Sequence, residues 1–169
     1  MKVLVAAASR HGATHQVAEA IGEELTAREL DVTVAHVEDV TSITEYDAVI
    51  IGSAIYFGKW MKPAKQLVTR HAAELATRPV WLYSSGPVPR PEAKADYSYD
   101  RREGDDIANA LRARDHRLFF GKLDRKRLSL VERGPVRMAK LPDGDFRPWD
   151  EIKIWAAEIA DALQSATAR

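Results

Sequence analysis

The chain has 169 residues, a length that suits one domain spanning residues 1–169 with a core buried without cross-links. Lys and Arg number 25, and Asp and Glu also number 25, so no overall field favours nucleic acid or an acidic partner. There is no cysteine, which excludes disulfides, thiolate metal sites and thiol nucleophiles. No apolar run approaches the roughly 20 residues of a membrane span. These features predict a cytoplasmic protein that does not bind nucleic acid.

Short apolar or β-branched runs predict five strands. They cover Lys2–Ala8, Val32–Val37, Ala48–Ser53, Pro79–Ser84 and His116–Gly121. Three of these runs, "VLVAAA", "AVIIGSA" and "VWLYSS", are continuous rather than alternating. Continuous runs are typical of parallel strands that are covered on both faces.

In the segments between the strands, apolar residues recur at helical spacing and predict helices. One helix follows Gly12, a second runs from Pro63 to Leu75, a weaker third covers Asp105–Arg112, and a last one begins at Pro148. Residues 37–47 show no clear pattern. Strands that alternate with helices predict an α/β fold with a doubly wound, five-stranded parallel sheet of strand order 2-1-3-4-5.

Ligands of such sheets bind beyond the carboxyl ends of the strands, near the point where the strand order reverses. The sequence places three loops there, Ser9–Thr14, Ala54–Trp60 and Ser84–Pro91. Two further stretches do not fit the minimal fold. Residues 86–104 are rich in proline and charge, which predicts a long loop or lid. Residues 122–147 form an insert before the last helix, in which apolar residues alternate with eight basic and four acidic ones.

The first of these loops, in "SRHGATHQVAEAI", places hydroxyls on both sides of Gly12. Such a turn at the start of a helix favours an anion, because the first N–H groups of a helix have no partner inside it. The alternative is that Ser9 and Thr14 only cap the helix. The loop has neither the lysine of a triphosphate-binding loop nor the three glycines of a dinucleotide site. Hydroxyls and backbone amides without a fixed cation suit a phosphate monoester.

This loop resembles the phosphate loop of flavodoxins, where a Ser/Thr-x-Ser/Thr-Gly-x-Thr pattern surrounds the phosphate of FMN. Ser9, Gly12, Ala13 and Thr14 match the pattern, whereas His11 stands where the family places a hydroxyl residue. Arg10 and His11 are either contacts to the ligand or solvated turn residues.

The second loop, in "GSAIYFGKWMKPAKQLV", is similar to the flavin-flanking loop of the flavodoxin-domain family that includes menaquinone-dependent protoporphyrinogen IX dehydrogenase. The resemblance implies that Tyr56 and Trp60 stack on the flavin and that Gly58 lets a carbonyl approach its N5 atom. Packing at the sheet edge is the alternative for both aromatic residues. Trp81 and Trp155 are expected in the core. The implied cofactor-binding residues of this loop are Ala54, Ile55, Tyr56, Phe57, Gly58 and Trp60.

The third loop, "YSSGPV", also matches, and it implies cofactor contacts by Ser84, Ser85, Gly86 and Pro87. The backbone amides of Ser85 and Gly86 are expected to face the flavin pyrimidine. The hydroxyls of this loop could instead satisfy a turn.

The resemblance implies an FMN-dependent oxidoreductase that passes electrons between a reduced organic substrate, such as a porphyrinogen, and a quinone-type acceptor. No catalytic side chain is assigned, because the flavin carries the redox chemistry. A flavodoxin-type carrier serving a redox partner protein is the alternative, and a flavin-free interaction domain is a third. Residues 122–140 of the insert are either a solvated face or a patch for substrate, quinone or peripheral contact with the inner face of a membrane.

Overall fold

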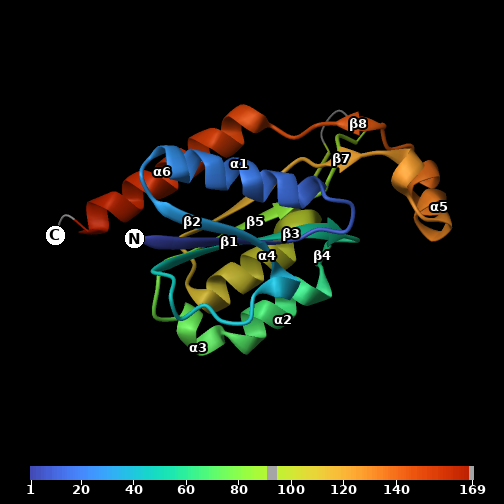
Figure 1. Ribbon diagram of the computed structural model, residues 1–169. Helices are drawn as coiled ribbons and strands as arrows, with labels where there is room; N and C mark the ends of the chain where they lie inside the picture. Colours follow the sequence, from blue (N-terminus) through green and yellow to red (C-terminus); the bar gives the residue numbers. More distant parts are fainter. Residues whose placement is uncertain (91–94, 168–169) are drawn as a thin grey trace.

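Five parallel strands form the centre of the protein in this computed structural model, which describes residues 1–90 and 95–167 (Figure 1). They are β1 (Lys2–Ala8), β2 (Asp31–His36), β3 (Ala48–Tyr56), β5 (Val80–Ser85) and β6 (Asp115–Phe119). The strand order is β2-β1-β3-β5-β6, and a short strand β4 (Lys59–Trp60) pairs antiparallel with β3. Counted over the parallel strands alone, this is the predicted order 2-1-3-4-5.

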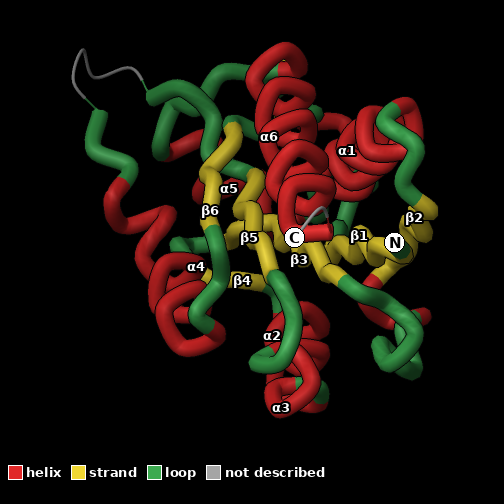
Figure 2. Tube along the Cα trace, turned by 90° about the vertical axis from the view of Figure 1, so that its left-hand side faces the viewer, coloured by secondary structure: helices red, strands yellow, loops and turns green. Residues whose placement is uncertain are grey.

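Helices cover both faces of the sheet (Figure 2). On one face lie α1 (Ala13–Ala27) and α6 (Trp149–Thr167), which pack Ile21 and Ile159 onto β1 and β3. On the other face lie α2 (Lys62–Arg70), α3 (Ala72–Leu75) and α4 (Ser98–Leu111). The central strands β1 and β3 are buried almost throughout, as their continuous apolar runs require. Trp81 and Trp155 are buried in the core, as expected.

Two of the predicted helices differ from the structure. The second helix is broken at His71 into α2 and α3, because the backbone of His71 leaves the helical region at φ −109°. The weak third helix begins at Ser98, well before Asp105, so residues 98–104 are not part of a loop. Its first turns were missed because they carry charges and present Gly104, rather than a large apolar residue, to the sheet. The predicted loop or lid also includes residues 91–94, which lie outside the described residues.

Residues 37–47 begin with a short 3-10 turn, η1 (Val37–Asp39). They then bury Val40 and Ile43 under the sheet without regular structure, which explains why no periodicity was found there.

The insert, residues 122–147, leaves the sheet after β6 and projects beyond the carboxyl ends of the strands (Figure 1). It contains the two-stranded ribbon of β7 (Lys122–Leu123) and β8 (Gly144–Asp145), a 3-10 turn η2 (Arg125–Arg127), and helix α5 (Leu130–Met138). Ser129 and Glu132 form a capping box at the start of α5. None of the helices in the described part of the chain has the length and apolar character that a bilayer crossing requires.

Candidate functional site

The loop after β1 begins the site. Gly12 precedes α1 in the left-handed region at φ +88°, where a residue with a Cβ is strained. Within the described residues, no side chain caps the start of α1. The helix therefore directs N–H groups outward without a side-chain acceptor, and the capping interpretation of Ser9 and Thr14 finds no support in this geometry.

A cavity of about 160 Å³ lies against this helix start, and we call it the phosphate cavity. Four chain segments that are far apart in the sequence meet around it: the loop after β1, the end of β3, the end of β5 with the residue that follows it, and the segment after β6. Its lining residues include Ser9, Arg10, His11, Ala13, Thr14, Gln16, Ala54, Ile55, Tyr56, Ser85, Gly86, Gly121, Lys122, Leu123, Asp124, Arg127 and Leu128.

A second cavity of about 430 Å³ begins where the first ends, and we call it the apolar cavity. The two share Ile55, Tyr56, Gly86, Lys122, Leu123 and Leu128. The remaining wall comes from the turn after β3, the loop after β5, the start of α4 and the insert. These residues are Phe57, Gly58, Pro87, Val88, Arg90, Tyr99, Asp100, Glu132, Pro135, Val136, Ala139 and Leu141.

The predicted cofactor residues line one or both of these cavities, except Gly12, Trp60 and Ser84. Trp60 is only 2% exposed and lines neither cavity, because its Nε1 donates to Ser84 Oγ at 2.7 Å inside the core. Ser84 is likewise fully buried and bonds to His116 Nε2 at 2.8 Å. Both side chains lie in the interior and form hydrogen bonds there, away from the two cavities. The predicted stacking of Trp60 on the flavin therefore does not fit this geometry.

Tyr56 is the aromatic residue that both cavities share. Burial of its ring raises the pKa of its phenol above the usual value, and the nearby Glu132 carboxylate adds to this rise. The Arg10 guanidinium lies 5.8 Å from the centre of the Tyr56 ring and partly offsets the rise. Tyr56 thus presents a neutral ring beside a cation, which suits a flat, electron-poor ligand.

The structure also shows what His11 contacts. Its Nε2 lies 3.4 Å from Glu132 Oε1 of α5, and Arg10 Nη1 lies 3.0 Å from the same oxygen. The pKa of Glu132 is lowered to about 2. The largest cause is the hydrogen bond that its carboxylate accepts from the Ser129 backbone N–H. Hydrogen bonds with the side chains of Ser129 and His11, and the charge of Arg10, lower it further. Arg127 donates to the His11 carbonyl at 3.2 Å. The insert is therefore attached to the loop after β1 through its side chains.

Several lining residues were missed at the level of sequence. Lys122, Leu123 and Leu128 come from the insert. Its mixture of basic and apolar residues does not by itself indicate that the insert lies against the loop after β1. Gln16 reaches the cavity because Arg147, buried beneath α1, donates to its Oε1 at 2.7 Å. Three cationic residues, Arg10, Lys122 and Arg127, also line the phosphate cavity, the last two from the insert.

The donor groups at this site fit a phosphate monoester bound through a hydroxyl-rich loop. Ser85 Oγ is buried, lines the phosphate cavity and has no hydrogen-bond partner among the described residues. A buried hydroxyl without a partner is costly, and a polar ligand in the cavity would satisfy it. The Gly86 N–H, in contrast, donates to the Phe119 carbonyl at 3.4 Å, so the prediction that it faces the flavin does not fit.

Comparison with known proteins agrees with this arrangement. The chain is 26% identical to protoporphyrinogen IX dehydrogenase [quinone] of Escherichia coli (strain K12), and the match covers 99% of both chains. A solved flavodoxin from the domain Archaea matches with a TM-score of 0.64 and 18% identity, over 97% of this chain and 99% of the other. Oxidised flavodoxin 1 from Bacillus cereus matches with a TM-score of 0.65 and 13% identity, over 95% and 98%.

These two likenesses to solved structures show the fold, and the family follows from a match to a sequence model. The model of the flavodoxin domain matches residues 4–147, which include all three loops and the whole insert. The cofactor that this family implies is FMN, and the phosphate cavity is where the chain offers donors for it. The protein belongs to the flavodoxin domain family and has a flavodoxin-type redox role.

Proposed function

We propose that the protein is an FMN-dependent oxidoreductase, which takes electrons from a reduced organic substrate and passes them to a quinone-type acceptor. The observation that carries this proposal is the apolar cavity beside the phosphate cavity. An electron carrier needs only an exposed flavin edge, whereas an enzyme needs a second space in which an organic substrate meets the flavin. Bound FMN would supply the redox chemistry, and the chain supplies binding and orientation.

The walls of the apolar cavity indicate the class of substrate. Leu128, Val136 and Leu141 of the insert form one side, and Phe57 at the turn after β3 forms another. Lys122 and Arg90 contribute cations at the rim, and Arg90 is itself paired with Asp100. A large apolar molecule with an anionic group fits these walls, and a porphyrinogen has both properties. The name of the Escherichia coli relative supports the same substrate and a quinone acceptor.

For FMN itself we propose contacts from each of the three loops. The phosphate would lie against the hydroxyls of Ser9 and Thr14 and the N–H groups of Gly12 and Ala13. The ring would lie against Tyr56, with further contacts from the residues that line both cavities, and with the Ser85 hydroxyl as a donor.

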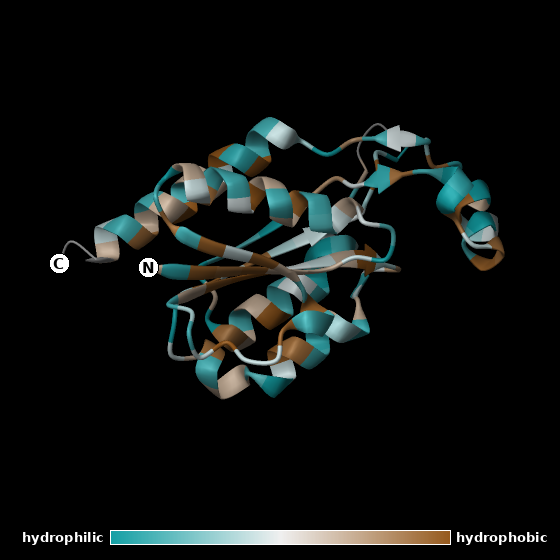
Figure 3. Cartoon of the chain, in the orientation of Figure 1, coloured by the Kyte–Doolittle hydropathy of each residue, from teal (hydrophilic) through white to brown (hydrophobic). Residues whose placement is uncertain are grey.

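The insert presents a surface that suits a membrane, where quinones reside. Leu130, Val131 and Met138 on α5 are each between 84% and 86% exposed. Figure 3 shows hydrophobic and hydrophilic residues mixed on this projecting helix. Arg133 and Arg137 lie on the same short helix. An exposed apolar face flanked by cations suits the interface of an anionic bilayer. We propose peripheral contact through this face in a cytoplasmic protein.

The proposal is tested by mixing the purified, FMN-loaded protein anaerobically with protoporphyrinogen and a soluble menaquinone analogue. We expect oxidation of the porphyrinogen that depends on both the protein and the quinone. If the protein binds FMN but oxidises no porphyrinogen, and instead transfers electrons to a partner reductase or oxidase, the carrier function favoured by the flavodoxin fold replaces it. A protein that binds no FMN would overturn both functions.

The membrane contact is tested separately, by sedimentation with vesicles that contain phosphatidylglycerol. We expect the variant Leu130→Ser/Met138→Ser to bind these vesicles at least tenfold more weakly than the unchanged protein. Ile154→Ser is the matched control, because Ile154 is also exposed but lies on α6. Equal sedimentation of the three proteins would contradict the contact.

A further inference from the structure

The turn between β3 and β4 is strained in a way that its own sequence does not explain. Ile55 pairs with Trp60 and Tyr56 with Lys59, so Phe57 and Gly58 form a two-residue hairpin loop. Both have positive φ, +52° for Phe57 and +70° for Gly58. A tight hairpin of this type prefers Asn or Asp followed by Gly, because a bulky residue disfavours the left-handed region. Phe57 is therefore held there by its surroundings.

The base of this hairpin is firmly attached to the rest of the protein. The Trp60 backbone N–H donates to Glu103 of α4, and the Met61 N–H donates to Ser53 Oγ at 2.9 Å. The Trp60 indole donates to Ser84, and Ser84 donates in turn to His116. Asp105 of α4 lies 2.7 Å from His116 Nδ1, which fixes the acceptor role of the opposite ring nitrogen.

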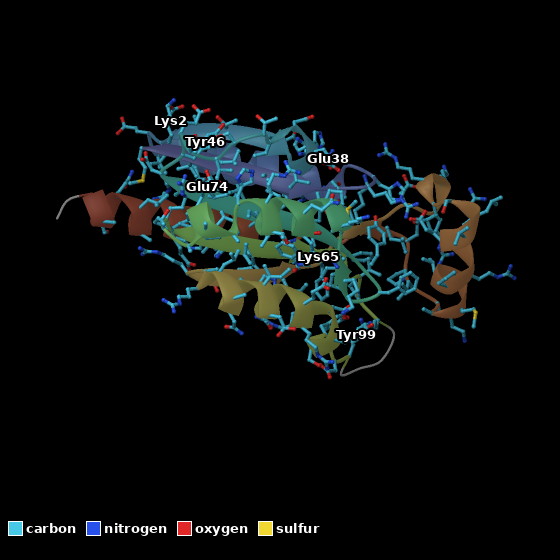
Figure 4. All side chains as sticks on the ribbon, turned by 90° about the horizontal axis from the view of Figure 1, so that it is seen from below. Lys2, Glu38, Tyr46, Lys65, Glu74 and Tyr99 are labelled. Carbon is cyan, nitrogen blue, oxygen red and sulfur yellow. The ribbon has the colours of Figure 1, made fainter. Side chains whose placement is uncertain are left out.

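Among the described residues, Tyr99 in the first turn of α4 is the one whose side chain forms a hydrogen bond with the tip of the hairpin. Its hydroxyl donates to the Phe57 carbonyl at 2.9 Å. Its ring occupies the space that a side chain at Gly58 would need. Tyr99 is 52% exposed and Phe57 is 75% exposed, so packing of the Phe57 ring adds little to hold the turn. Figure 4 shows Tyr99 at the end of α4 that lies beside the insert.

We propose that Tyr99 is a positioning residue, which holds the Phe57–Gly58 turn in its left-handed form and so fixes the wall of the apolar cavity next to the flavin. Phe57, Gly58 and Tyr99 all line this cavity. The inference rests on the proposed function, because the turn acts on FMN only if FMN binds. Without the Tyr99 hydroxyl, Phe57 can relax to a negative φ, and its carbonyl and ring leave their present places.

The experiment uses Tyr99→Phe, which removes the hydroxyl and keeps the ring over Gly58. One hydrogen bond corresponds to a change of up to about tenfold in an equilibrium constant. We therefore expect Tyr99→Phe to change the ratio of the affinities for oxidised and reduced FMN by about threefold to tenfold. A tenfold change is about 30 mV in the two-electron potential. Tyr46→Phe is the matched control, because Tyr46 lies toward the other end of the sheet (Figure 4).

A second substitution separates positioning from a general loss of structure. Phe57→Asn lowers the cost of the left-handed backbone, so the turn no longer depends on the tyrosine hydroxyl. In Phe57→Asn/Tyr99→Phe, we expect less than half of the effect that Tyr99→Phe has alone. In the FMN-free protein, Tyr99→Phe should also move the backbone chemical shifts of Phe57 toward values typical of negative φ.

The possible outcomes distinguish this inference from the function on which it rests. If the unchanged protein binds no FMN, the proposed function fails, whereas the chemical shifts still test the turn. If FMN binds but its potential and the Phe57 shifts are the same with and without the hydroxyl, the positioning role of Tyr99 is refuted. Equal weakening of oxidised and reduced FMN, with no change in potential, also refutes it.

Discussion

Replacing Glu132 by Gln should release α5 from the loop after β1. Glu132 is the one α5 residue that bridges to both Arg10 and His11, at 3.0 and 3.4 Å. Gln keeps the shape of the side chain and its place in the capping box with Ser129, since Gln also serves at that position. The substitution therefore removes the charge while the helix itself is retained.

The magnitude follows from the exposure of the partners. The Arg10 side chain is 52% exposed, and an ion pair with such a group contributes about 0.2 to 1 kcal/mol. His11 adds a weaker contact whose strength depends on its protonation. We expect the free energy that holds α5 against the loop after β1 to fall by about 1 kcal/mol. This corresponds to a roughly fivefold increase in the population in which α5 is detached.

A helix of 9 residues is marginally stable in water once it is detached from the rest of the protein, so exchange of the α5 backbone amides follows this population. We expect exchange about fivefold faster in Glu132→Gln for the amides of residues 132–138, except Pro135, which has none, and unchanged exchange in α1. Glu158→Gln is the control, because Glu158 pairs with Arg117 at 3.3 Å on an exposed surface away from the insert. Equal exchange in α5 of the parent and of Glu132→Gln would show that the ion pairs do not hold the insert.

Acid should have the same effect as the substitution. The pKa of Glu132 is lowered from 4.5 to about 2 in the folded protein. The Ser129 backbone hydrogen bond is the largest cause, followed by the Ser129 and His11 side chains and the Arg10 charge, so the lowered pKa stabilises both the cap and the attachment of α5 above pH 4.5, and this contribution is lost as the pH falls toward 2. The variant Glu132→Gln should not show this pH dependence of α5 exchange, relative to a reference amide in α1.

Three other substitutions test separate parts of the site. Thr14→Ala should weaken FMN binding by about 1 to 3 kcal/mol, because it removes hydroxyl bonds to a charged group; a titration that shows equal affinity for Thr14→Ala and the control Thr69→Ala would contradict this. Gly58→Ala should lower the free energy of unfolding by about 1 to 2 kcal/mol, because its φ is +70°. A urea transition at the parent's midpoint would argue against that strain. Arg147→Met should lower the free energy of unfolding by about 2 kcal/mol, because Arg147 is buried and pairs with Asp145. An unchanged urea midpoint would show that this ion pair does not stabilise the fold.

The sheet could be predicted from the sequence because its central strands are buried on both faces. The continuous apolar runs Val3–Ala8 and Val49–Ala54 are typical of buried parallel strands and of few other structures. The strand order then follows from the right-handed crossovers between the strands. The polar turn between β1 and α1 could be predicted for a similar reason. Its hydroxyls and Gly12 lie within one short turn, so spacing along the chain is also proximity in space.

Residues whose role depends on distant partners could not be predicted. Trp60 follows an apolar strand in a loop, where stacking on a ligand and burial look alike in the sequence. What decides between them is the hydrogen bond to Ser84, which lies 24 residues away. His11 is the stronger case, because its partner Glu132 is 121 residues away. Helix α4 was shortened in the prediction because charges and Gly104 hide its buried face.

The segments that line the phosphate cavity are synthesised at different times, because they lie far apart in the sequence. Ser9 and Thr14 leave the ribosome early, whereas Gly121–Leu128, which form the facing wall, follow only after most of the chain. Contacts of such long sequence separation form late in folding. A nascent chain that ends before residue 121 therefore has the hydroxyl loop but only part of a binding site. All the segments that line the cavity are therefore present only once the chain has been synthesised through Leu128.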